Sequence, residues 1–199
     1  MPNWCETNYV IEGPQEDLTA LNNVLTSLKA METPLVDNGF GVLWVGCLVA
    51  ILGGDTSKIY CRGEILDFSY ENGIIRMHIE SAWSELREMR WFIHKKLPKL
   101  KFYFQSEEPG MCIFESNDKE GRYFPERWLL DWNDESRNLY LYEYFTDLPA
   151  VVAYLKENGV IENDIQPTKE AINAVLDQIQ EERPDNISFM LEQFIVVDD

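Results

Sequence analysis

The chain has 199 residues, of which 45% are hydrophobic and 13% aromatic, enough apolar material for a packed core and too much for a disordered chain. Its 35 Asp and Glu residues against 17 Lys and Arg give a net charge of −18. Phosphate backbones and anionic lipid surfaces repel such a chain, so we expect neither direct nucleic-acid binding nor a membrane partner. The charge serves solubility in one interpretation. In another it attracts a basic protein partner or imitates the charge of a nucleic acid.

The first 62 residues predict a strand, a helix and an irregular insertion. Thr7 to Glu12 is strand-like, and Gly13-Pro14 ends it. The next apolar residues share one face of a helix that should end near Ala30: Leu18, Leu21, Val24, Leu25 and Leu28. The insertion, about residues 32–62, carries the apolar run Val42–Leu52, which is far shorter than the ~20 residues of a transmembrane helix. We expect a buried element there. An amphipathic membrane contact is the alternative, and the lack of flanking Lys and Arg clusters argues against it.

The middle of the chain predicts a hairpin, a helix and two strands. Two strand-like runs, 64–70 and 74–80, flank Asn72-Gly73, the strongest short hairpin signal. Ser84 is a natural N-cap for a helix that Pro98 stops. A strand over 100–105 follows, and Pro109-Gly110 turns the chain into one more strand.

The last third is aromatic and acidic. Residues 139–145 form a possible strand, and Asp147 and Thr168 are N-caps for two helices. The final apolar element runs from Phe189 to Val197. Trp128, Trp132, Tyr140 and Tyr142 are core residues in one interpretation and protein-contact residues in the other.

The order strand, helix, strand, strand, helix, strand predicts an α+β fold of the ferredoxin-like βαββαβ type. We expect an antiparallel sheet with helices on one face, an extra edge strand and a C-terminal α/β extension. The expected domains are a ferredoxin-like domain over residues 1–125, with the insertion at about 32–62, and a C-terminal subdomain over residues 126–199.

Three short motifs carry a resemblance to a known family. Asn3-Trp4-Cys5 precedes the first strand, Ala82-Trp83-Ser84 lies between a strand and a helix, and Glu107-Glu108-Pro109-Gly110-Met111-Cys112 joins the last core strand to the added one. In this order they resemble YubB-like proteins, a phage- and plasmid-associated bacterial family with a ferredoxin-like domain. Relatives tend to have prolines after the Trp-Ser, where this chain has Glu85 and Leu86. The family has no established activity, so the resemblance implies a fold and no mechanism.

The chain offers few residues for catalysis. His78 and His94 are the two histidines, so a dyad of His78 with Cys61 or Cys112 is the main nucleophilic candidate. The carboxylates of Glu80, Glu107, Glu108 and Asp131 could do acid–base work in a cleft between the sheet and the C-terminal helices, although solvated surface is the simpler interpretation. Asn117, Asp118 and Glu120 offer oxygen ligands without a complete calcium loop. The four cysteines form no Cys-x-x-Cys pair: Cys5, Cys47, Cys61 and Cys112. We expect them to be reduced and mostly buried thiols. The alternative is a zinc site that combines distant cysteines with His78.

Three functions follow as hypotheses. The first is a non-catalytic protein-interaction module of a mobile-element or accessory type. The second is an acidic nucleic-acid mimic that binds a basic protein, and the third is a carboxylate-based enzyme. We expect no catalytic residues, metal or cofactor, a cytoplasmic location, and an unidentified protein partner. The candidate functional or structural cluster joins the three motifs, which either line one site or anchor the N-terminus: Asn3, Trp4, Cys5, Trp83, Glu107, Glu108, Pro109 and Gly110.

Overall fold

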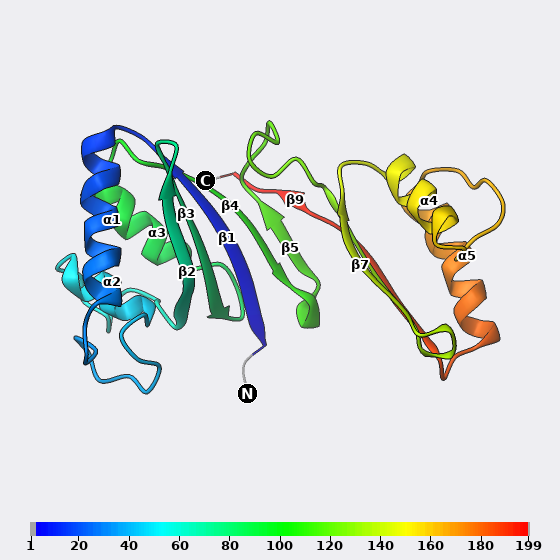
Figure 1. Cartoon of the computed structure of the whole chain (residues 1–199), viewed down its shortest axis with the longest axis horizontal. Helices are drawn as coiled ribbons and strands as arrows, with labels where there is room; N and C mark the ends of the chain where they lie inside the picture. Colours follow the sequence, from blue (N-terminus) through cyan, green and yellow to red (C-terminus); the bar gives the residue numbers. More distant parts are fainter. Residues whose placement is uncertain (1–2, 199) are drawn as a thin grey trace. The chain divides into compact units, whose positions relative to one another are not determined.

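The computed structural model describes residues 3–198, which form a mixed α+β structure with two β-sheets (Figure 1). The chain divides into two compact units. Residues 3–118 with 197–198 make unit 1, and residues 119–196 make unit 2. The expected boundary at residue 125 lies in the segment that precedes the first strand of unit 2. No helix within the described residues is long and apolar enough to span a membrane.

Unit 1 contains five adjacent strands in the order β2-β3-β1-β4-β5. Strand β1 pairs antiparallel with β3 and with β4, β2 pairs antiparallel with β3, and β5 with β4. The strand expected after Pro109-Gly110 is β5. The bounds are β1 Trp4–Glu12, β2 Gly63–Glu71, β3 Ile74–Ala82, β4 Lys101–Glu108 and β5 Ile113–Ser116. The short strand β9 (Ile195–Val196) belongs to unit 2.

Three helices lie on the same side of this sheet: α1 (Gln15–Lys29), α2 (Val45–Ile51) and α3 (Arg87–Lys96) (Figure 1). The buried positions of α1 are Leu18, Leu21, Leu25 and Leu28, as the helical periodicity predicts. They pack in one apolar core with Tyr9 and Ile11 of β1. The apolar run in the insertion forms α2, whose first five residues are buried.

The hairpin β2–β3 turns at Asn72 and Gly73, whose φ angles are 53° and 76°. Both residues therefore have the positive φ of a type I′ turn, which explains the Asn-Gly pair. The hairpin is confirmed, and a bulge between Ile65 and Asp67 shifts its register.

The start of α3 differs from the sequence-based prediction. The helix begins at Arg87, and its N-cap position is Leu86, which makes no side-chain capping bond. The Ser84 hydroxyl instead lies 3.4 Å from the backbone oxygen of Glu85. The predicted Ser84 cap is wrong, because two further residues, Glu85 and Leu86, precede the helix.

Unit 2 contains a three-stranded antiparallel sheet with the order β7-β6-β8 and two helices. The bounds are β6 Trp128–Asp134, β7 Leu139–Phe145, α4 Leu148–Glu157, α5 Lys169–Glu182 and β8 Ile187–Gln193. The expected caps are present: Ala150 N–H donates to Asp147 Oδ1 over 2.9 Å, and Ala171 N–H donates to Thr168 Oγ1 over 3.2 Å. The central strand β6 was not predicted.

Candidate functional site

The three family-like motifs converge at the start of β1. Trp83 N–H donates a 2.9 Å hydrogen bond to the backbone oxygen of Asn3. A Cβ atom at Gly110 would lie 2.6 Å from Asn3 Nδ2, so Gly110 packs closely against the Asn3 amide. Segments far apart in the sequence are therefore held together through Asn3.

Glu108 has a structural position within this cluster. Its buried carboxylate accepts hydrogen bonds from Gly110 N–H over 2.9 Å and from Met111 N–H over 2.7 Å. These bonds cap the short 3₁₀ helix η1 (Pro109–Met111). Neighbouring β4 residues alternate between faces, so Glu107 lies on the opposite face of the sheet, in register with Glu6.

The two tryptophans of the motifs do not anchor the core. Trp4 is 37% exposed and Trp83 is 42% exposed. Trp83 also has a φ angle of 74°, a left-handed conformation that is rare for a bulky residue. The contacts through Asn3, rather than burial of the two indole rings, join the N-terminal motif to the rest of unit 1.

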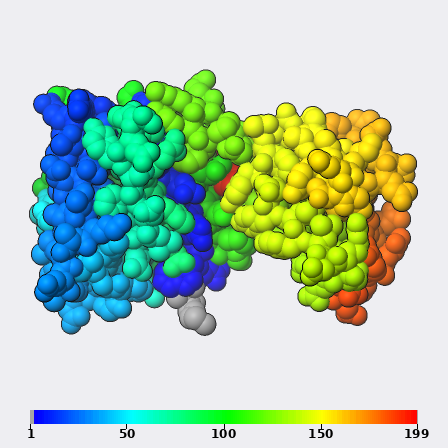
Figure 2. Space-filling view, viewed as in Figure 1, coloured from blue at the N-terminus to red at the C-terminus, as the bar shows by residue number. Residues whose placement is uncertain are grey.

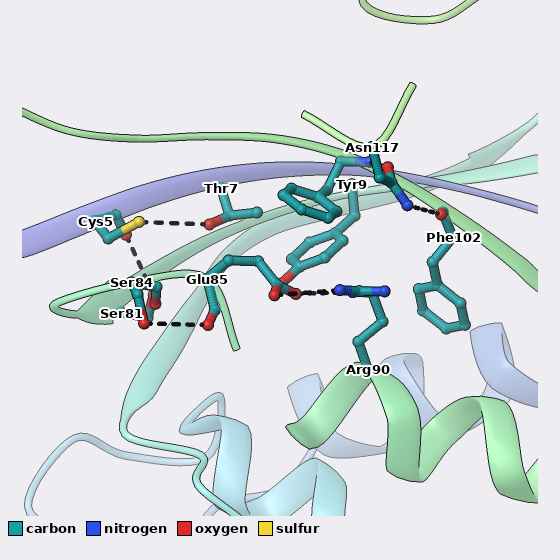
Figure 3. A network of polar contacts seen from close by, with 10 residues as sticks. Cys5, Thr7, Tyr9, Ser81, Ser84, Glu85, Arg90, Phe102 and Asn117 are labelled. Atoms are coloured by element: carbon teal, nitrogen blue, oxygen red, sulfur yellow. Dashed lines mark hydrogen bonds and ion pairs between the residues drawn. The ribbon is translucent and has the colours of Figure 1, made fainter. Parts of the chain in front are cut away.

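Cys5 is a buried thiol with a chemically inert setting. Its Sγ lies 3.8 Å from Thr7 Oγ1 (Figure 3). Burial raises the pKa of Cys5 to about 11, and the charges of Glu85 and Glu108 act in the same direction. The thiolate is the nucleophilic form of cysteine, so Cys5 is a poor nucleophile near neutral pH.

A buried ionic network lies beside this cluster, and sequence reasoning missed it. Tyr9 O–H donates a 2.7 Å hydrogen bond to Glu85 Oε1, and Arg90 Nε donates to the same oxygen over 2.9 Å (Figure 3). The Arg90 guanidinium also stacks over Phe104 at 4.9 Å from the ring centroid. Burial first, and then the Glu85 charge, raise the pKa of Tyr9 well above its ordinary value. The network joins β1, the loop before α3 and α3 itself.

The face of the sheet opposite the helices carries a row of glutamates. Register places Glu64 of β2 opposite Glu80 of β3, Glu80 opposite Glu6 of β1, and Glu6 opposite Glu107 of β4. Figure 2 shows part of β1, in dark blue, at the surface beside the teal β2–β3 hairpin. Like charges directly opposite on neighbouring strands destabilise a sheet. The register therefore places four acidic side chains side by side across four strands, an arrangement that strand pairing alone does not favour.

His78 and Cys61, two of the candidates for a catalytic dyad, lie in different environments. His78 Nε2 lies 3.2 Å from Glu6 Oε2 on the face of the sheet opposite the helices, whereas Cys61 lies in the apolar core. Burial raises the pKa of Cys61 to about 11. Burial also raises the pKa of Asp131, which lies in unit 2 and therefore in a different sheet from Glu107 and Glu108. Within residues 3–198, no three or more His, Cys, Asp or Glu side chains are arranged to hold a metal ion.

The predicted aromatic residues of unit 2 divide between two environments. Trp132 is fully buried in the core of unit 2, and Trp128 packs against that core. Tyr140 is 64% exposed and stacks on Tyr142 with 6.4 Å between ring centroids. The core interpretation therefore holds for Trp132 and Trp128, and a protein contact through exposed Tyr140 stays a prediction.

Comparisons with known proteins leave the family open. No family model matches the sequence, and no curated protein matches it significantly. Among solved structures, an unknown protein from Galdieria sulphuraria aligns with 96% of this chain and 98% of its own chain, at 10% sequence identity and a TM-score of 0.25. A TM-score this low carries no argument about fold or function.

Proposed function

We propose that unit 1 is a ferredoxin-like domain. We further propose that the protein is a non-catalytic interaction module, which binds a basic protein segment on the face of this sheet opposite the helices. The strand order around β1 and the three helices on one side support the fold. The resemblance to YubB-like proteins stays a prediction. The row Glu64, Glu80, Glu6 and Glu107 is the observation that carries the function.

The row is suited to cations because neighbouring strands lie about 4.8 Å apart. Carboxylates at that spacing repel one another in the free protein, and Lys or Arg side chains between them would remove the repulsion. Binding of a basic partner relieves this repulsion, and the relief adds to the free energy of binding. Within the row, His78 Nε2 lies 3.2 Å from Glu6 Oε2.

Trp4 adds an apolar contact beside the row. It lies two residues before Glu6 on β1, so both side chains are on the same face of the sheet, and its indole is partly exposed. An arginine can bond a carboxylate and stack on an indole at the same time. The partner that fits best is therefore an Arg-rich segment rather than a Lys-rich one.

A peptide-binding experiment tests this proposal. Fluorescently labelled nona-arginine is titrated with the protein at low salt and followed by anisotropy. The double variant E6Q/E80Q is compared with E170Q/E181Q, which removes the same two charges from exposed positions on α5. We expect the row variant to weaken binding about tenfold, which corresponds to roughly 0.7 kcal/mol for each carboxylate. We expect the α5 variant to change binding less than twofold.

Two results would contradict the proposal. Equal loss in the two variants would show that the peptide senses net charge alone. Equal affinity for nona-arginine and nona-lysine, with no change in Trp4→Ala, would show that the indole has no part in recognition.

A further inference from the structure

A recess between α3 and the first half of β4 is separate from the features described above. Its volume is about 420 Å³, within the range of about 300–1,000 Å³ that is usual for small-molecule sites. All of its lining residues belong to unit 1: Arg90, Trp91, His94, Leu100, Lys101, Phe102 and Tyr103.

The charge of this lining is opposite to that of the chain. The lining holds the basic side chains of Arg90 and Lys101 with the His94 imidazole, and none of the lining residues is Asp or Glu, although acidic residues outnumber Lys and Arg by 35 to 17 in the whole sequence. Glu85 lies 2.9 Å from Arg90, and Glu12 lies 4.0 Å from Lys101. The lining therefore favours an anion near Lys101, whose side chain is largely exposed.

The histidine has a defined orientation in this lining. His94 Nδ1 lies 3.0 Å from the backbone oxygen of Leu100. A carbonyl oxygen only accepts hydrogen bonds, so Nδ1 carries a hydrogen and donates it. This bond joins α3 to the residue before β4 and holds one wall of the recess against the other.

The apolar part of the recess is aromatic. Trp91 is 52% exposed, whereas Met89 and Ile93 of the same helix are fully buried. The Arg87 guanidinium lies 5.5 Å from the centroid of the Trp91 ring. An indole left this exposed beside a recess has area available for a flat apolar ligand. Leu100 and Phe102 are buried and supply an apolar floor.

We propose that this recess binds a small organic anion that carries a flat aromatic ring system. The ring packs against Trp91 and the apolar floor, and the anionic group is held near Lys101 and His94. This site does not use the glutamate row, so it is independent of the proposed binding of a basic segment.

A pair of dyes tests both halves of the proposal. 1-Anilinonaphthalene-8-sulfonate carries the ring system and a negative charge, and N-phenyl-1-naphthylamine has the same ring system without the charge. Each is titrated into the protein, and dye fluorescence gives affinity and stoichiometry. We expect one sulfonate dye per chain, bound at least fivefold more tightly than the neutral dye.

Variants then assign the site. Trp91→Ala is expected to weaken both dyes about tenfold, and Lys101→Gln is expected to weaken the sulfonate dye about fivefold with little effect on the neutral dye. Lys95→Gln is the matched control, because Lys95 is exposed on α3 and does not line the recess. Circular dichroism melting verifies that each variant is folded. Equal affinity for the two dyes, the same loss in Lys95→Gln as in Lys101→Gln, or binding that Trp91→Ala leaves unchanged would overturn the proposal.

Discussion

The Tyr9 hydroxyl donates a 2.7 Å hydrogen bond to Glu85 Oε1, and this bond fixes the loop before α3 to the middle of β1. The same oxygen accepts from Arg90, so one buried carboxylate serves a strand and a helix together. A buried carboxylate is stable only when its charge is paired and hydrogen-bonded. The position of α3 on the sheet therefore depends on the whole network.

The first prediction concerns the members of this network. Glu85→Gln leaves the buried Arg90 charge without its partner, so we expect it to lower the free energy of unfolding by about 3–5 kcal/mol. Tyr9→Phe removes one hydrogen bond to a charged group, and we expect a loss of about 1.5–3 kcal/mol. Urea unfolding followed by near-ultraviolet circular dichroism measures both. Tyr140→Phe, at an exposed position, is the control, and a larger loss in Tyr9→Phe than in Glu85→Gln would contradict the network.

The second prediction concerns acid stability of unit 2. Burial alone would raise the pKa of Asp134, but hydrogen bonds from Ser136 and Arg137 N–H, with the Arg183 guanidinium at 3.0 Å, lower it below its ordinary value. A lowered pKa means that the ionised carboxylate stabilises the fold above the ordinary pKa near 3.9, and that this stabilisation is lost as the pH falls through the folded value. We expect the wild type to lose stability below about pH 4.

Arg183→Met tests the source of this effect. The side chain of Arg183 is partly exposed, so we expect a loss of about 2 kcal/mol at pH 7, less than for a fully buried pair. Asp134→Asn should also be destabilised at pH 7, but its stability should fall less than that of the wild type between pH 5 and pH 3. Urea titrations at these pH values measure it. Parallel pH profiles for the wild type and Asp134→Asn would show that another group is responsible.

The third prediction concerns the left-handed conformation of Trp83. This conformation costs a bulky residue about 1 kcal/mol or more, whereas Asn adopts it readily. Only 42% of Trp83 is exposed, so removing the indole also exposes apolar area that it buries, and we expect both Trp83→Asn and Trp83→Ala to lower the melting temperature. The fall should be smaller in Trp83→Asn, because Asn tolerates the left-handed conformation better than Ala does. Differential scanning calorimetry measures both changes, and an equal or larger fall in Trp83→Asn would show that the left-handed conformation carries no strain.

The fourth prediction concerns the thiols. Cys112 is exposed, whereas Cys5, Cys47 and Cys61 are buried. With a thiol-reactive chromophore at pH 8 we expect one fast-reacting cysteine per chain, and the other three should react only after denaturation. Cys112→Ser should abolish the fast phase. A fast phase that survives in Cys112→Ser would mean that one of the buried thiols opens readily to solvent.

The local elements were predictable from the sequence, and the long-range pairings were not. The Asn72-Gly73 hairpin and the Asp147 and Thr168 caps follow from chemistry within a few residues. Strand β6 was missed because Leu129, Leu130 and Trp132 are all buried, so its polar and apolar residues do not alternate along the strand. Glu85 and Arg90 are five residues apart, which is not a standard helical pairing distance. The glutamate row depends on the register of four strands.

The chain leaves unit 1 after Asp118 and returns to it at Val197, whose N–H donates a 2.9 Å hydrogen bond to the backbone oxygen of Ser116. Unit 2 is therefore an insertion whose two connections start from neighbouring backbone positions. During synthesis, the ribosome must complete all of unit 2 before the last bond of unit 1 can form. A protease that removes only residues from Val197 onward should therefore abolish the hydrogen bond to Ser116 and leave every residue of unit 2 attached.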